Sequence, residues 1–472
     1  MIEMSAAQMA SLMSGELRGI ANPETFFIDR GAEFQFDSRQ VRKGDVFLAL
    51  KGEHADGHDF VSNAIGNGAA ISIVTKPVSG PQIIVKDVMQ AIAQLSRYVR
   101  VQLSDMKVIG ITGSQGKTTT KDMLHSILQN AGSTISARGS FNNDLGVPLT
   151  LLRADIDTKF CVIEMGARHG GDILALTQIA IPDVGAVLKV GNAHLGEFGS
   201  RENIAAAKGE LIAGLQPGAV AVLGTYDEFT PKMPFATGVK KITFGEGHDC
   251  DVRAADIEFR GGYAHFDLVT PEGREPVALR VLGLHQIPNA LAAAAISYSL
   301  GISTAHIAAA LSMHETTNKW RMELHEGNDL LLINDAYNAN PESMEAAIRT
   351  LVLLTQERGG RSWAFLGTMH ELGEKAAQMH EQIGELAEQL GVDHLVAIKN
   401  EDYLRGLKGL ATQKHYFVGV NEAKSVISEF EPGDVILVKA SRAEHLEELA
   451  MAIVSQAIHE EKQESVEEEN GK

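Results

Sequence analysis

Short apolar runs alternate with helical periods through the first part of the chain. Two segments, 59–67 and 88–103, repeat their apolar residues at the spacing of an amphipathic helix. Around them lie runs rich in β-branched or aromatic residues, which are typical of strands. These runs occupy residues 46–50, 70–74 and 83–85. The alternation predicts a small α/β domain over residues 1–104.

A second pattern begins at Lys107, where the strand-like run 108–112 leads into a glycine-containing turn and then a helix. Apolar strands that are joined by helix-length segments are typical of a parallel sheet. Between residues 240 and 282 the apolar positions instead alternate with period two, which predicts an antiparallel patch. We assign residues 105–316 to this central domain. Its further apolar strands are predicted at 160–163, 184–190 and 219–223.

The α/β pattern returns over residues 317–459, which predicts a C-terminal Rossmann-like domain. Residues 460–472 are charged and nearly free of apolar side chains, so we expect a disordered acidic tail. The predicted fold class is therefore α/β, with a small N-terminal domain, a central parallel sheet of the P-loop ATPase type with an antiparallel patch, and the Rossmann-like domain. The strands of that last domain are predicted at 330–333, 363–366, 394–398 and 435–438.

Composition excludes several classes of protein. Of the 472 residues 44% are hydrophobic, yet no run approaches the roughly 20 apolar residues of a bilayer helix, so we expect no membrane insertion. The 42 Lys+Arg against 61 Asp+Glu give a net charge of −19, which disfavours nucleic acid as a partner. The two cysteines, Cys161 and Cys250, are too few for a disulfide framework. A reducing compartment, the cytoplasm, is the expected location.

A phosphate-binding loop is predicted between the strand at 108–112 and the following helix. Small residues there let backbone N–H groups turn onto phosphate oxygens, while Lys117 supplies a cation and Thr118 a hydroxyl for Mg²⁺. Five residues separate Gly110 from Gly116, so the strict P-loop spacing of four is not met. A glycine-rich turn with an incidental lysine is the alternative, disfavoured because strand, turn, Gly-Lys-Thr and helix occur together. The predicted nucleotide-binding residues are Gly113, Ser114, Gln115, Gly116, Lys117, Thr118 and Thr119.

Three residues outside the loop are candidates on weaker grounds. Glu164 ends a predicted buried strand, so its carboxylate would emerge beside the loop as a Mg²⁺ ligand, although a surface acid would also fit. His194 also follows a buried strand, where a structural histidine is the commoner case. Lys208 has the local pattern of a solvated helix lysine.

Seven segments resemble the motifs of the Mur ligases, the ATP-dependent amide-bond-forming enzymes of peptidoglycan precursor synthesis. The resemblance runs from about residue 36 to residue 445. In chain order the segments are Thr-Gly-Ser-Gln-Gly-Lys-Thr-Thr at 112–119, Phe-Asn-Asn-Asp-Leu-Gly-Val-Pro-Leu at 141–149, Glu-Met-Gly-Ala at 164–167, Ala-His-Leu at 193–195, Ala-Lys-Gly-Glu at 207–210, His-Gln-Ile-Pro-Asn-Ala at 285–290 and Asp-Ala-Tyr-Asn-Ala-Asn-Pro at 335–341.

Further segments resemble one branch of that family, which adds D-alanyl-D-alanine to UDP-N-acetylmuramoyl-tripeptide. They are Asp-Ser-Arg at 37–39, Gly-Asp-Val-Phe-Leu-Ala-Leu-Lys-Gly at 44–52, Met-His-Glu-Leu-Gly at 369–373 and Tyr-Asn-Ala-Asn-Pro at 337–341. Three positions depart from the branch pattern. Asn334 stands where an acid is common, Thr368 where Asp is usual and Ala440 where Gly is usual. These departures bear on dipeptide recognition more than on ATP chemistry.

The resemblance implies a mechanism and its catalytic residues. The γ-phosphoryl group of ATP passes to the tripeptide's terminal carboxylate, and the amine of D-alanyl-D-alanine attacks the acyl phosphate, so that ADP and phosphate are released. Thr118 and Glu164 are implied to hold Mg²⁺ between the β- and γ-phosphates. His194 and Lys208 are implied to serve a second Mg²⁺, with Lys208 as a carbamate. Lys117, His194 and Lys208 are thus the expected catalytic residues.

The resemblance also implies contacts with nucleotide and substrate. Asn289, Arg321 and Asp335 would contact the nucleotide across a domain boundary. Local explanations exist for some of the substrate residues, since Asn142 and Asn143 fit a turn and Asn340 before Pro341 fits a helix N-cap. The expected substrate residues are Ser38 and Arg39, at the uridine-diphosphate end, with Asn142, Asn143, Tyr337, Asn338 and Asn340.

Two other functions stay open at this point. One is a related ligase that adds a single amino acid to a UDP-muramoyl peptide or to folate, against which the branch-specific segments argue. The other is a non-catalytic scaffold that binds nucleotide, suggested only by Thr368 and Ala440. The presence of the five expected catalytic and metal-binding residues argues against it. We expect a monomer.

Overall fold

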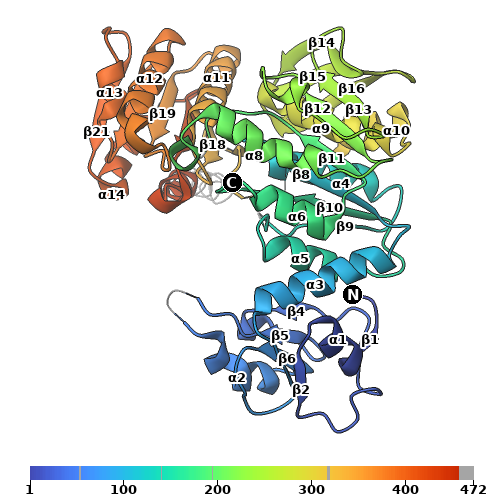
Figure 1. Ribbon diagram of the computed structural model, residues 1–472. Coiled ribbons are helices and arrows are strands. Elements are labelled where there is room, and N and C mark those ends of the chain that lie inside the picture. The colour runs from blue at the N-terminus through green and yellow to red at the C-terminus, as the bar shows by residue number, and fades with distance from the viewer. Residues whose placement is uncertain (53–54, 140, 194, 316–318, 457–472) are drawn as a thin grey trace, which may run out of the picture.

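The structure is a computed structural model that describes residues 1–52, 55–139, 141–193, 195–315 and 319–456. His194 and the predicted tail at 460–472 lie outside the described residues, so neither prediction is tested. Figure 1 shows three bodies, with the N-terminal one below the central one and the C-terminal one beside it. The predicted three-domain α/β fold class is confirmed, whereas its residue boundaries stay predictions.

The N-terminal body contains a five-stranded sheet in the order β2-β7-β6-β5-β4, parallel except for β2. Helix α3 packs its apolar face, including Ile92 and Leu95, on this sheet. The helix predicted over 59–67 is a 3-10 turn at Gly57–Phe60 followed by α2. The elements are β1 (Met4–Ser5), α1 (Ala6–Leu12), β2 (Glu16–Arg18), β3 (Phe27–Ile28), β4 (Phe34–Gln35), β5 (Val46–Leu48), α2 (Val61–Gly66), β6 (Ile71–Val74), β7 (Gln82–Ile84) and α3 (Val88–Gln102).

The central body is built on a nine-stranded sheet in the order β16-β15-β14-β13-β12-β11-β8-β10-β9. Strands β8 to β14 run parallel to one another, and β15 and β16 add an antiparallel extension to the same sheet. The predicted antiparallel patch is thus present. The strands are β8 (Lys107–Thr112), β9 (Thr134–Ser136), β10 (Phe160–Glu164), β11 (Val184–Val187), β12 (Val220–Gly224), β13 (Lys240–Gly245), β14 (Val252–Arg260), β15 (Tyr263–Thr270) and β16 (Gly273–Leu282).

The helices of the central body cover both faces of this sheet. The alanine-rich α9 is almost wholly buried, because its small side chains let it approach the sheet and α4 closely. Strand β11 ends earlier than predicted, since beyond Val187 the chain turns to pass the phosphate loop. There the backbone N–H of Ser114 donates to the carbonyl of Lys189 (3.0 Å). The helices are α4 (Lys117–Leu128), α5 (Gly146–Leu152), α6 (Asp172–Ala180), α7 (Leu195–Phe198), α8 (Arg201–Ala213), α9 (Ile287–Ser299) and α10 (Thr304–Met313).

The C-terminal body has a six-stranded sheet in the order β17-β18-β22-β19-β20-β21, parallel except for β17. The predicted strands are found, and the polar edge strands β17 and β21 are additional. The elements are β17 (Glu323–Gly327), β18 (Leu330–Asp335), α11 (Pro341–Arg358), β19 (Ser362–Leu366), α12 (Ala376–Gln389), β20 (His394–Ile398), α13 (Asp402–Gly406), β21 (Gln413–Phe417), α14 (Val420–Ala423) and β22 (Val435–Lys439).

Polar contacts join the three bodies. Arg138 of the central body donates both terminal nitrogens to the carboxylate of Glu33 in the N-terminal body (2.7 and 2.6 Å). Gln115 of the central body donates to Asn340 of the C-terminal body (2.8 Å). The carboxyl ends of the central and C-terminal sheets therefore meet around one space. Over the described residues, no helix combines the length and the apolar character needed to cross a membrane.

Candidate active site

A cavity of about 790 Å³ lies between the central and C-terminal bodies. The central body contributes the loop after β8, Glu164 at the end of β10 and the segment after β11. The C-terminal body contributes residues at or just beyond the ends of β18 and β22, including Asp335 and Ser441. Both walls are thus carboxyl ends of parallel strands, the place where α/β folds bind ligands. The cavity brings together most of the residues predicted to bind nucleotide.

The loop between β8 and α4 has the geometry of a phosphate site. Gly116 precedes the first residue of α4 with φ +80, and a Cβ there would lie 2.1 Å from Oδ1 of Asn289. Lys117 is partly buried and donates from Nζ to the carbonyl of Gly113 (2.7 Å). Burial lowers its pKa, with Glu164 opposing that shift and Arg321 adding to it. The loop thus presents a helix N-terminus and a lysine to an anion.

Replacing Gly116 with alanine is expected to weaken ATP binding about tenfold or more. A left-handed alanine alone costs about 1–2 kcal/mol, and its methyl group would displace Asn289. Calorimetric titration with a non-hydrolysable ATP analogue measures the loss. Gly218→Ala is the matched control, because Gly218 has φ +94 and open space around its Cβ position. Equal affinity for the analogue in Gly116→Ala and the native chain would contradict this account of the loop.

Glu164 is fully buried, so its description as a surface acid is wrong. Its Oε2 accepts from the hydroxyl of Thr118 (3.4 Å), and Nζ of Lys121 lies 3.6 Å from Oε1. Among the described residues Oε1 has no hydrogen-bond partner. Burial raises the pKa of the Glu164 carboxyl. The positive charge of Lys121, and to a smaller extent that of Lys117, opposes this rise. A buried carboxylate oxygen lacking a hydrogen bond, beside a threonine hydroxyl, is a donor set that fits a hard cation such as Mg²⁺.

Lys208 is also buried, with 5% of its surface exposed, so the prediction of a solvated helix lysine is wrong. It lies on the inner face of α8 between Ile204 and Ile212. Burial, and secondarily the positive charge of Lys117, lower its pKa to about 7. A substantial fraction of this amine is therefore neutral near pH 7. Its expected partner His194 lies outside the described residues.

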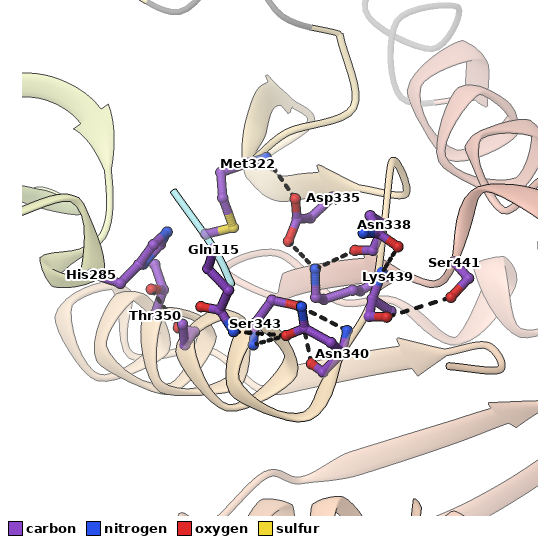
Figure 2. A network of polar contacts seen from close by, with 12 residues as sticks. Gln115, His285, Met322, Asp335, Asn338, Asn340, Ser343, Thr350, Lys439 and Ser441 are labelled. Carbon is purple, nitrogen blue, oxygen red and sulfur yellow. Dashed lines mark hydrogen bonds and ion pairs between the residues drawn. The ribbon is translucent and has the colours of Figure 1, made fainter. Parts of the chain in front are cut away.

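The C-terminal wall holds a polar network that Figure 2 shows around Asp335 and Lys439. Lys439 donates from Nζ to Oδ2 of Asp335 (2.5 Å) and to the carbonyl of Asn338 (2.9 Å). The other carboxylate oxygen of Asp335 accepts from the backbone N–H of Met322 (3.1 Å). The guanidinium of Arg321 lies 3.9 Å from the ring centre of Tyr337. The predicted residues 321, 335, 337 and 338 therefore line one wall in fixed positions.

Asn340 has the helix-capping role that its sequence context predicts, while its substrate role stays a prediction. Its side chain caps α11 by accepting from the backbone N–H of Ser343 (2.9 Å), within a capping box. The same oxygen accepts from Nε2 of Gln115 in the phosphate loop (2.8 Å). Glu342, the second residue of α11, accepts from the backbone and side-chain nitrogens of Asn192 (2.7 and 2.8 Å). The N-terminus of α11 thus rests on the phosphate loop.

The remaining predicted substrate residues are more scattered. Asn142 lines the cavity, and its carbonyl accepts from the backbone N–H of Gly166 (2.8 Å). Asn143 instead accepts the backbone N–H of Gly146 at the start of α5 (3.0 Å), which fits its turn explanation. Ser38 and Arg39 lie in the N-terminal body and do not line this cavity. The Arg39 side chain is 86% exposed and pairs with Asp37 (2.8 Å).

The sequence reasoning missed several cavity residues. Lys439 ends the buried strand β22, so the strand-end argument applied to Glu164 would also have found it. Glu342 and Asn192 meet across 150 residues of sequence, and no local pattern indicates their contact. His370 lies in the segment 369–373 that carries the branch resemblance, but its contact with Glu444, 74 residues away, has no local signal.

The chain matches three family descriptions that together cover most of its length. They are "Mur ligase family, catalytic domain" over residues 33–104, "Mur ligase middle domain" over 111–297 and "Mur ligase, glutamate ligase domain" over 320–442. The chain belongs to the Mur ligase family. The predicted family is therefore confirmed.

Its relatives define a narrower group. The UDP-N-acetylmuramoyl-tripeptide–D-alanyl-D-alanine ligase of Mycobacterium tuberculosis (strain ATCC 25618 / H37Rv) is 37% identical, covering 96% of this chain and 98% of its own length. The ligase of the same name from Escherichia coli (strain K12) is 33% identical, covering 96% and 99%. Among solved structures, MurF from Acinetobacter baumannii has a TM-score of 0.87 and 36% identity, covering 96% of this chain and 99% of that one. MurF ligase from Thermotoga maritima in complex with ADP has a TM-score of 0.79 and 30% identity, covering 91% and 99%.

Proposed function

We propose that this chain is an ATP-dependent, ADP-forming ligase that joins D-alanyl-D-alanine to UDP-N-acetylmuramoyl-tripeptide in peptidoglycan precursor synthesis. The observation that carries the proposal is the shared cavity, in which Lys117, Glu164 and Asn142 of the central body face Arg321 and Asp335 of the C-terminal body. The full-length similarity to ligases of that name supports the choice of substrates. The cytoplasm as location and the monomeric state are part of the same proposal.

The chemistry requires activation of a carboxylate, because an amine cannot displace oxide or hydroxide from it in water. Transfer of the γ-phosphoryl group to the tripeptide's terminal carboxylate gives an acyl phosphate, from which phosphate can leave. Negative charge develops on the transferring oxygens, where the Lys117 ammonium and the amides at the start of α4 are placed to stabilise it. These groups are fixed before the reaction, so they need little reorganisation.

Metal ions have a place in this proposal. Thr118 and Glu164 would hold one Mg²⁺, while His194 and Lys208, as a carbamate, would hold a second. Bound Mg²⁺ would neutralise phosphate charge and reduce the repulsion between phosphate and substrate carboxylate. Oε1 of Glu164, which has no hydrogen-bond partner within the described part of the chain, supports the first assignment. The depressed pKa of Lys208 supports the second, since only a neutral amine forms a carbamate.

The other proposed contacts combine cavity residues with residues that lie outside the cavity. Asn289, against Gly116, and Arg321 with Asp335 would contact the nucleotide from the two bodies. We assign the tripeptide and dipeptide region to a set of residues from all three bodies. These residues are Asn142, Asn143, Tyr337, Asn338 and Asn340, with Ser38 and Arg39 at the uridine-diphosphate end.

Phosphate release with different acceptors tests the proposed function. With ATP, Mg²⁺ and UDP-N-acetylmuramoyl-tripeptide, we expect rapid release with D-alanyl-D-alanine and at most slow release with single amino acids. Coupled detection of phosphate, with mass spectrometry of the product, provides the measurement. Preference for a single amino acid would point to a related ligase. Absence of turnover with every acceptor would point to a nucleotide-binding scaffold.

A further inference from the structure

A histidine–glutamate pair contributes its histidine, His370, to the cavity wall of the C-terminal body. His370 lines the cavity, and its ring Nε2 lies 2.7 Å from Oε1 of the nearly buried Glu444. Nζ of Lys399 lies 3.1 Å from the other carboxylate oxygen of Glu444. The carboxylate therefore orients the ring and places a proton on Nε2, which leaves Nδ1 as the basic nitrogen.

The segment that carries His370 is held in place by buried groups. The backbone N–H of His370 donates to the hydroxyl of Ser441 (3.0 Å). One residue earlier, the backbone N–H of Met369 donates to the ring of the buried His380 (2.9 Å). The buried Tyr403 donates its hydroxyl to the carbonyl of Gly367 (2.7 Å). The backbone that carries the ring is thus held by buried groups, and the ring itself, 46% exposed, is oriented by Glu444.

Unusual backbone conformations surround the pair. Glu371, Lys399 and His445 adopt left-handed conformations with φ of +64, +62 and +55, although none of them is glycine. Glu371 directly follows His370, Lys399 contacts Glu444, and His445 directly follows Glu444. Such conformations cost free energy and cluster at functional sites, where the surrounding structure imposes them. Their arrangement around one pair indicates more than a surface ion pair.

The turn after His370 packs against the central body. A Cβ on Gly196 in α7 would lie 3.2 Å from the carbonyl oxygen of Glu371 and 3.0 Å from the backbone nitrogen of Gly373. Gly196 belongs to the segment after β11, which also lines the cavity near the phosphate loop. The turn that follows His370 therefore packs against the wall that faces the phosphate site.

We propose that His370 is the base that removes a proton from the amino group of the acceptor. The inference rests on the proposed function, in which that amine attacks an acyl phosphate. The amine reaches the site as an ammonium, because its pKa in solution is about 8. Nδ1 of His370 takes one of its three protons, and the nitrogen lone pair then attacks the acyl carbon.

The step balances in atoms and charge. The new C–N bond forms as the bond between the acyl carbon and the phosphate oxygen breaks. The departing phosphate takes a second proton, and the third stays on the amide nitrogen. Glu444 holds the imidazolium that forms, as a carboxylate does for a catalytic histidine.

His370→Ala tests this role in three assays. We expect amide formation with D-alanyl-D-alanine to fall about 10²-fold or more. Acyl-phosphate formation should persist. It is measured without acceptor, as exchange of ¹⁸O between the bridging and non-bridging positions of the ATP β-phosphate. Hydroxylamine, an amine that is largely neutral at pH 7, should react with the intermediate at nearly the native rate. Added imidazole should restore part of the rate with the dipeptide.

Two further variants complete the design. Glu444→Gln should show the same pattern with a smaller loss, since it keeps a hydrogen-bond partner for the ring but removes the charge. His445→Asn is the matched control, because His445 is 61% exposed and asparagine tolerates its left-handed backbone. Native amide formation by His370→Ala, or equal losses in the exchange and hydroxylamine assays, would overturn the role of His370. Absence of exchange in the native enzyme would instead refute the proposed function.

Discussion

Lys117→Ala is expected to lower kcat by about 10²–10³-fold or more while the protein still folds. The lysine Nζ lies within the loop that receives the phosphates, 2.7 Å from the carbonyl of Gly113. Removing a preorganised group that stabilises charge in the transition state has an effect of this size. Steady-state phosphate release gives kcat, and a thermal melt reports folding.

A lysine at the start of the preceding strand provides the control for this prediction. Lys107 begins β8 at the opposite end of the sheet, where it is half exposed and forms a weak ion pair with Asp183 (3.6 Å). Lys107→Ala should keep its native kcat, because exposed pairs of this kind contribute little. A Lys117→Ala enzyme with native kcat would refute the assignment of the phosphate loop.

Lys208→Ala is the second change for which we expect loss of most activity. The side chain is buried and its pKa is lowered to about 7, so it can react with CO₂ as a neutral amine. As a carbamate it would offer oxygen donors that Mg²⁺ prefers. Formate or acetate added to Lys208→Ala should therefore restore part of kcat by supplying the missing oxygens.

A spectroscopic measurement separates the carbamate from other roles of this lysine. In ¹³C-bicarbonate the native protein should show a carbamate carbon resonance that Lys208→Ala lacks. Lys240→Ala, which changes an exposed lysine at the start of β13, should keep both the resonance and the native rate. Native turnover by Lys208→Ala would mean that the buried lysine has no part in catalysis.

The course of the strands could be predicted because buried parallel strands are continuous apolar runs. Strands β8, β10 and β18 were found on this basis. With them came the loop after β8, which begins at Gly113, and the strand ends at Glu164 and Asp335. The edge strands β17 and β21 were missed, since their partly exposed residues lack that pattern. Apolar continuity thus reveals the inner strands of a sheet better than its edges.

The environment of a side chain was harder to predict than its position on an element. Lys208 was taken for a solvated residue, yet it shares the helical row of Ile204 and Ile212, four residues away on either side. That spacing was a usable signal for its burial. No such signal exists for the contact between His370 and Glu444, because only the folded C-terminal sheet brings residues 74 positions apart together.

Transfer of oxygen from substrate to phosphate tests the central claim most directly. UDP-N-acetylmuramoyl-tripeptide labelled with ¹⁸O in its terminal carboxylate is incubated with the native enzyme, ATP and D-alanyl-D-alanine. An acyl phosphate makes one carboxylate oxygen the bridge to phosphorus, and attack at carbon leaves that oxygen on the phosphate. We predict one ¹⁸O atom in each phosphate released with product. Unlabelled phosphate formed alongside the amide product would contradict the account.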